Sequence, residues 1–256
     1  YMRISLALLI GVALGGLAGW YAKDSVPETS QSMEPKSPVE QLMEGQKMVR
    51  NLPFPSLVHE VTGRQVWAVD DASQHIVTAI REAAEKTRLY LNDPNGPART
   101  QRRINEISRF AEEYLKNTLS QASGLHCEYP INAKGKIQRS GYPDLMVTDT
   151  SNGRVAYVDP KLYKAGSESS TLRTFYFQPK RETSKILHSA YHFVIAFRHD
   201  GNTGGWHFDK CKLIDLHQFQ IGLKVEFQGS NRDLYRDELL VKPPIPSTTK
   251  SSVGDP

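Results

Sequence analysis

Two consecutive strand-like runs joined by a tight turn constrain the fold more than any other feature of this sequence. The runs YPDLMVTDT (142–150) and RVAYVDPKLYK (154–164) are rich in β-branched and aromatic residues, and Ser151, Asn152 and Gly153 stand between them. Such runs around a short turn of small and polar residues are typical of a β-hairpin. We therefore expect two antiparallel strands here, within the central sheet of the protein.

Three charged side chains interrupt this predicted hairpin. Asp144 lies near the start of the first run, and Asp159 and Lys161 lie in the second. Antiparallel pairing brings Asp144 close to Asp159, and strand alternation puts Asp159 and Lys161 on one face. Two carboxylates with nothing between them repel each other, and Mg²⁺, which takes oxygen ligands, would remove that repulsion. The pattern predicts a metal site able to hydrolyse a phosphodiester. The alternative is one turn aspartate and two surface residues, because strings this short also occur by chance.

Helical and strand patterns around the hairpin predict a mixed α/β core. Apolar residues recur at helical spacing over 72–92 and 99–124, whereas 125–132, 191–200 and 206–216 resemble strands. The segment 56–70 predicts a hairpin or two short strands around Gly63, and 179–190 predicts a short helix. The core order from residue 99 is then helix, strand, strand, strand, helix, strand.

Pro143-Asp144 followed by Asp159-Pro160-Lys161, in this order of elements, resembles the PD-(D/E)xK nuclease superfamily over residues 99–200. The resemblance implies a restriction-endonuclease-like fold, with a mixed central sheet flanked by helices. It implies Mg²⁺, with Mn²⁺ as a substitute, and cleavage of nucleic acid, DNA rather than RNA. It also implies that Asp144, Asp159 and the Pro160 carbonyl bind the metal and that Lys161 is the catalytic lysine.

Many members of that superfamily add an acid from the preceding helix. At about 100° per residue, Glu112 lies about 100° from Ala111, the centre of the apolar face, whereas Glu106 and Glu113 point near the opposite side. Glu112 is therefore the candidate further metal ligand, and the alternative is that it is only a surface residue at the edge of that face.

Polar and basic residues follow the predicted lysine strand. By analogy with the superfamily, Gln178 is a candidate catalytic residue, although loop hydrogen bonding would also explain it. Arg173, Lys180, Arg181 and Lys185 are candidate contacts to nucleic-acid phosphates. The net charge of +4 is too small to indicate nucleic acid by itself, and each basic cluster could simply be solvated.

The N-terminal segment predicts a membrane anchor. Ile4 to Ala22 is an apolar stretch of 19 residues, about the length that crosses a bilayer. A cleaved signal segment, which would leave a secreted protein, is the alternative; Trp20 fits poorly at its cleavage site. Arg3 before the stretch favours export of the following domain, and glycines at four-residue spacing would allow a homodimer.

We expect five regions along the chain: an anchor or signal segment (1–22), a flexible linker (23–44), an N-terminal strand and helix extension (45–98), the nuclease-like domain (99–241) and a disordered tail (242–256). We interpret Cys127 and Cys211 as two buried thiols, and a disulfide between them is the alternative if the domain is exported. Three functions compete: a tethered metal-dependent nuclease, a nuclease-like module that only binds DNA or a partner, and a membrane-tethered adaptor in which the motif arose by chance.

Overall fold

The computed structural model describes Glu44 and residues 50–171, 175–202, 205–223, 230–234 and 236–239. The chain divides into two units, residues 1–41 and 42–256, and every described residue belongs to the second. The predicted anchor, most of the linker and the predicted tail lie outside the described residues. In the part that is described, no helix is both long enough and apolar enough to cross a membrane.

Along the described chain a group of helices precedes most of the strands. The strands are β1 (Leu52–Pro53), β2 (Leu125–Glu128), β3 (Leu145–Asp149), β4 (Val155–Lys164), β5 (Tyr191–His199), β6 (Phe208–Asp215) and β7 (Gln220–Ile221). The helices are α2 (Phe54–Thr62), α3 (Gln74–Leu91), α4 (Ile104–Ser120) and α5 (Asn231–Leu234). Four 3₁₀ turns are η1 (Asp71–Ser73), η2 (Pro97–Arg99), η3 (Arg181–Thr183) and η4 (Asp237–Leu239).

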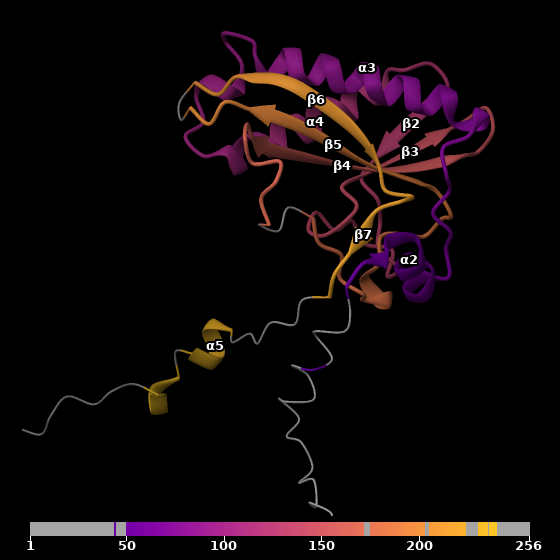
Figure 1. Cartoon of the computed structure of the whole chain (residues 1–256), viewed down its shortest axis with the longest axis vertical. Coiled ribbons are helices and arrows are strands. Elements are labelled where there is room, and N and C mark those ends of the chain that lie inside the picture. Colours follow the sequence, from indigo (N-terminus) through magenta and orange to yellow (C-terminus); the bar gives the residue numbers. More distant parts are fainter. Residues whose placement is uncertain are drawn as a thin grey trace, which may run out of the picture. The chain divides into compact units, whose positions relative to one another are not determined.

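A five-stranded mixed sheet in the order β2-β3-β4-β5-β6 forms the centre of the domain (Figure 1). Only the β4–β5 pair is parallel; β2–β3, β3–β4 and β5–β6 are antiparallel. The predicted mixed α/β class is confirmed, and the hairpin around Asn152 and Gly153 is present as β3 and β4. A separate two-stranded sheet pairs β1 with β7.

Helices α3 and α4 pack on one face of the five-stranded sheet (Figure 1). Their buried side chains recur at helical spacing and share one core with all five strands. Tyr90 of α3 stacks on Tyr114 of α4 with ring centroids 4.0 Å apart. Helix α3, which the sequence predicted as part of an extension, therefore belongs to the same core as α4.

The opposite face of the sheet is covered by α2 and by loops. Phe54 is fully buried there, with Tyr157 and Val194 of the sheet in the same cluster. Because β4 alternates, its even residues Ala156 and Val158 face α3 and α4. Its odd residues, among them Asp159 and Lys161, share the other face with Tyr157.

The expected hairpin or strand pair over residues 56–70 is wrong, because that segment begins inside helix α2. Prolines at positions 53 and 55 suit the first turn of a helix, where their missing N–H groups leave no bond unmade. Gly63 ends the helix in a left-handed conformation with φ of 70°, and its N–H donates to the carbonyl of His59. Phe54 and Val58 provide the buried face.

The short helix expected over 179–190 is also wrong, since the described residues there form only the 3₁₀ turn η3. The backbone N–H groups of Leu187 and His188 donate to the Tyr157 hydroxyl, at 2.9 and 3.2 Å, and not to carbonyls one helical turn back. A tertiary hydrogen bond thus replaces the helix. The parallel connection from β4 to β5 is made by a long segment that lacks an α-helix in its described residues.

The two cysteines are both free thiols. Cys127 is buried in β2 and Cys211 is half-buried in β6. The preferred interpretation of two thiols therefore holds, although only Cys127 is fully buried, and the alternative of a disulfide does not.

Candidate active site

The candidate site lies in a notch of the sheet that strand lengths create. Strand β3 begins at Leu145, which pairs with Val158, whereas β4 continues to Lys164. Beyond Val158, β4 pairs only with β5 among the strands described. Asp144 immediately precedes β3, so its side chain and those of Asp159 and Lys161 meet where the neighbouring strand is missing.

The three predicted charges converge in this notch. Lys161 Nζ lies 2.5 Å from Asp159 Oδ2 and 3.8 Å from Asp144 Oδ2. The Asp159 side chain is only 2% exposed, whereas Asp144 and Lys161 are 19% and 28% exposed. One buried carboxylate is therefore backed by the core, and the other two groups open toward solvent.

The two aspartates in the notch form an electrostatic environment that favours a cation. Burial, followed by the nearby charge of Asp144, raises the pKa of the Asp159 carboxyl to about 7, although Lys161 opposes this shift. Asp159 Oδ2 is buried, and its close contact is the ion pair with Lys161 Nζ. Two carboxylates that meet beside one lysine fit a hard divalent cation, which binds through carboxylate and carbonyl oxygens.

The donor set is small. No group of three or more histidine, cysteine, aspartate or glutamate side chains is placed to hold a metal ion in the described residues. Asp144 and Asp159 would therefore be the two carboxylate ligands. Pro160 lines a cleft that Asp144 and Lys161 also line, which is consistent with a role for the Pro160 carbonyl. Mg²⁺ suits such a site, because it keeps several waters and needs one or two carboxylates.

Glu112 of α4 borders the same cleft but is engaged elsewhere. Its Oε1 lies 2.8 Å from Arg139 Nη2, and its side chain is 15% exposed. Burial, and then the charge of Asp144, raises the pKa of Glu112 to about 7. The predicted position at the edge of the helical core is what the structure has. Direct ligation of a metal by Glu112 stays a prediction.

Lys185 is placed differently from the expectation. The sequence suggested a surface contact to phosphate, but Lys185 is only 2% exposed. Burial lowers its pKa, and the charges of Asp144, Asp159 and Glu112 act in the opposite direction. Lys185 therefore belongs to the charge cluster of the site and not to an outer DNA-facing surface.

The other predicted residues lie outside the notch or outside the described residues. Gln178 is exposed, lines neither cleft beside the aspartates, and accepts a hydrogen bond from Lys180 N through its backbone carbonyl. Lys180 is also exposed. Arg173 lies outside the described residues. The proposed catalytic role of Gln178 has no geometric support here and stays a prediction.

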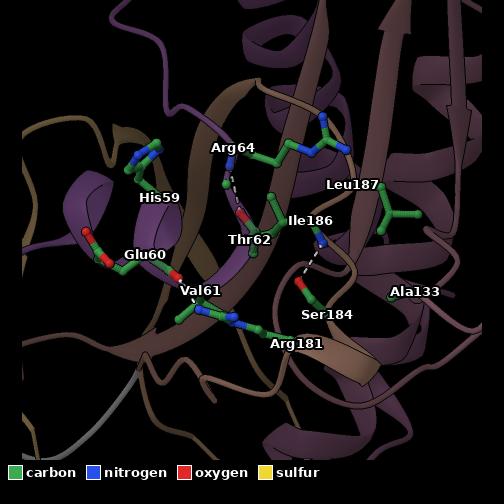
Figure 2. A pocket seen from close by; sticks show the side chains of 11 residues that line it. His59, Glu60, Val61, Thr62, Arg64, Ala133, Arg181, Ser184, Ile186 and Leu187 are labelled. Carbon is green, nitrogen blue, oxygen red and sulfur yellow. Dashed lines mark hydrogen bonds between the residues drawn. The ribbon is translucent and has the colours of Figure 1, made fainter.

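Arg181 lines a separate cavity of about 440 Å³ between the end of α2 and the segment 181–187 (Figure 2). Its Nη2 donates to the backbone carbonyl of Glu60 at 3.1 Å. In Figure 2 the Arg64 side chain extends away from Arg181, so the two guanidinium groups do not converge on one ligand. Arg181 holds α2 in place, in addition to any contact it makes with nucleic acid.

Two clefts meet at Asp144 and Lys161. One, of about 370 Å³, is bounded by the start of α4, Glu112 and Pro160. The other, of about 240 Å³, is lined by Asp159 and by residues that include Arg139 and Tyr176. The two clefts together leave space on both sides of Asp144.

The sequence interpretation did not single out Arg139 and Tyr176 as site residues. Arg139 lies over the ring of Tyr129 at 3.9 Å while it pairs with Glu112. Both residues lie in loops with no motif of their own. The only available signals were the basic cluster around Arg139 and the aromatic run FYF at 175–177.

Together the fold and the site define a class: a mixed α/β protein with two aspartates and a lysine at a sheet notch that fits a divalent cation. The comparison with known families is more specific. The sequence model of the type II restriction enzyme MjaV family matches residues 48–238, three quarters of this chain. The chain belongs to that family.

A curated relative supports this assignment. The chain is 26% identical over 206 residues to the type II restriction enzyme MjaV of Methanocaldococcus jannaschii. The alignment covers 75% of this chain and 89% of the relative. The family match contains Glu112, Asp144, Asp159 and Lys161, so the whole candidate site lies within it.

Proposed function

We propose that this protein is a divalent-metal-dependent endonuclease that hydrolyses phosphodiester bonds in DNA, with a PD-(D/E)xK active site. The observation that carries the proposal is the convergence of Asp144, Asp159 and Lys161 in one notch of a chain in a type II restriction enzyme family. One acid immediately precedes β3, the other lies in β4, and the lysine follows the second acid by two residues, in agreement with the superfamily pattern.

The aspartates and the Pro160 carbonyl would hold Mg²⁺, or Mn²⁺ in its place. When bound, the cation would polarise the scissile phosphate and stabilise the negative charge that develops during hydrolysis. Asp159 provides a buried, rigidly held oxygen, and the more exposed Asp144 faces the open cleft.

Lys161 orients the attacking water and stabilises negative charge at the phosphate. Its ammonium is held by two carboxylates and still reaches solvent, so it can donate to a water or to a phosphate oxygen that enters the notch. With Arg139 and Lys185 it also balances the three acids of the cluster. The cluster thus pairs three cations with three acids, and a metal and a phosphate, whose charges oppose each other, would enter together.

Substrate contacts beyond the notch would come from exposed cations. Lys180 and Arg181 are exposed on the connection that follows β4, and Arg173 is a third candidate. Such contacts to the phosphate backbone position a duplex without reading its sequence, and they weaken as salt rises. These roles, like that of Gln178, rest on the sequence pattern.

The test is cleavage of supercoiled plasmid DNA by the full chain in Mg²⁺, in Mn²⁺ and in EDTA, with RNA and linear DNA assayed in parallel. We expect discrete DNA fragments with either metal and none in EDTA. Asp144→Ala and Asp159→Ala should each abolish cleavage. Asp149→Ala, which changes a buried aspartate of the same strand pair outside the notch, should retain it wherever the variant is folded by circular dichroism.

An inactive but folded wild-type protein that still binds DNA would favour the alternative of a non-catalytic module. Cleavage that persists in EDTA would contradict the metal site itself.

A further inference from the structure

Two aromatic residues of the connection between β4 and β5, Phe175 and Tyr176, line the cleft at the candidate site, and Tyr176 is the more exposed of the two. Phe175 and Phe177 are half-buried and pack edge-on against the fully buried Phe54, with ring centroids 5.6 and 6.0 Å away. Tyr176 stands between them and is 47% exposed. Exposure alternates along residues 175–177, and the Tyr176 side chain is the exposed one between two neighbours that pack on the core.

Tyr176 faces the cleft beside the proposed metal ligands. It lines the cleft of about 240 Å³ whose other walls include Asp144, Asp159 and Lys161. Arg139 lines the same cleft. An aromatic ring, a guanidinium and the proposed metal ligands thus surround one small space.

The anchoring of the neighbours fixes the backbone beneath the ring. Tyr142 packs against Phe175 at 5.0 Å between ring centroids, and Phe219 packs against it at 5.4 Å. The aromatic cluster therefore holds the segment from several sides. A large ring that is held partly in solvent by a rigid support is pre-organised for a planar partner, since little conformational freedom remains to be lost on binding.

The proposed position of the phosphodiester indicates which part of the DNA lies next to Tyr176. A phosphodiester held at the aspartates carries a nucleotide on each side, and a base next to it is the planar, apolar surface within reach of such a ring. Base–aromatic stacking is favourable for every base with an uncovered π-face, so in duplex DNA the flanking base first leaves the helical stack, at a cost of a few kcal/mol. We propose that Tyr176 stacks on a nucleobase that flanks the scissile phosphate, an inference that rests on the proposed nuclease function.

The stack would position the substrate and would not take part in bond cleavage. Tyr176 sets the nucleotide so that the phosphate enters the notch, and Lys161 and the aspartates act on that phosphate. Binding energy away from the reacting atoms can contribute to orientation in this way.

The experiment compares variants on intact and abasic DNA. The ends of cleaved plasmid locate the scissile phosphate, and short duplexes are then made in which each flanking nucleotide in turn is replaced by an abasic one. The measured quantity is kcat/KM in Mg²⁺. For the wild-type protein, one of the two abasic replacements should lower kcat/KM by about 5- to 150-fold, the loss that one base–aromatic stack gives.

Tyr176→Ala should lower kcat/KM by a similar factor on intact DNA and should show no further loss on the abasic duplex. Tyr176→Phe should behave like the wild-type protein, because it keeps the ring. Leu89→Ala, a change at a 56% exposed residue of α3, is the control and should alter neither substrate.

Two results would overturn the inference while leaving the nuclease function in place. One is an Ala variant that cleaves intact DNA as fast as the wild-type protein. The other is an Ala variant that loses the same factor on abasic as on intact DNA, which would show that the ring acts on something other than the base. Absence of any Mg²⁺-dependent cleavage by the wild-type protein would instead overturn the proposed function, and the inference would fall with it.

Discussion

Asp159→Asn is expected to stabilise the metal-free protein above neutral pH, whereas Asp149→Asn is expected to destabilise it. Both aspartates are buried, at 1% and 0% exposure. The pKa of Asp159 is raised by burial and by the charge of Asp144. The pKa of Asp149 is lowered, because hydrogen bonds from Ser151 and His75 outweigh its burial. The pair is therefore a matched test of the electrostatics at the notch.

The sign follows from proton linkage. A carboxyl whose pKa is higher in the folded chain binds more protons when folded, so stability falls as the pH rises from the unfolded pKa through the folded pKa. For Asp159 that interval runs from 3.8 to about 7. At about 1.4 kcal/mol per pKa unit, the ionised carboxyl costs at most about 4 kcal/mol above pH 7. Asparagine removes this cost, so its advantage should be absent near pH 4, grow toward pH 7 and then stay constant.

Thermal unfolding of the full chain in EDTA at pH 4.5 and pH 8 measures the effect. At about 2–4 °C per kcal/mol for a chain of this size, Asp159→Asn should raise Tm by at most about 8–16 °C at pH 8 and by little at pH 4.5. Asp149→Asn should lower Tm at pH 8, because it leaves a partner of the lost carboxylate oxygen without its acceptor, at about 1–3 kcal/mol. An Asp159→Asn variant that is less stable than the wild-type protein at pH 8 would refute the reasoning.

Three further predictions concern single side chains. Lys161→Ala should abolish cleavage while Mg²⁺ affinity, measured by calorimetry, stays the same or rises, since a neighbouring positive charge is removed; full activity in a folded variant would contradict the assigned role. Glu112→Ala should reduce kcat/KM less than loss of either aspartate, and the exposed Glu113→Ala should leave it unchanged; equal losses would argue against a specific role for Glu112. Phe54→Ala should cost about 3–5 kcal/mol in chemical denaturation, because it empties the centre of a buried aromatic cluster; a cost below about 1 kcal/mol would mean that the cluster does not hold the connection.

The hairpin and its charges could be predicted from the sequence because they depend on local rules. Turn residues at 151–153 set the antiparallel pairing, and a side-chain period of two put Asp159 and Lys161 on one face. The same holds for Glu112, whose position follows from helical geometry around Ala111. Such features need no knowledge of distant contacts.

Features that depend on tertiary contacts could not be predicted in this way. The helix expected near Leu187 is replaced by hydrogen bonds to Tyr157, 30 residues away. Lys185 is buried because distant elements pack around it, and the local sequence pattern does not indicate this packing. The neighbours of Tyr176 are anchored by Phe54 and other aromatic residues far along the chain. For α2, the reason is simpler: the prolines that start the helix were not read as helix-starting residues.

The central claim is that Asp144 and Asp159 together hold the catalytic metal, and the most direct measurement is anomalous diffraction from crystals soaked in Mn²⁺. The account predicts an anomalous peak bonded to carboxylate oxygens of both aspartates, with Lys161 beside it, and no such peak in crystals of Asp159→Asn. A peak at another group of residues, or an Asp159→Asn crystal that keeps the same peak, would contradict it.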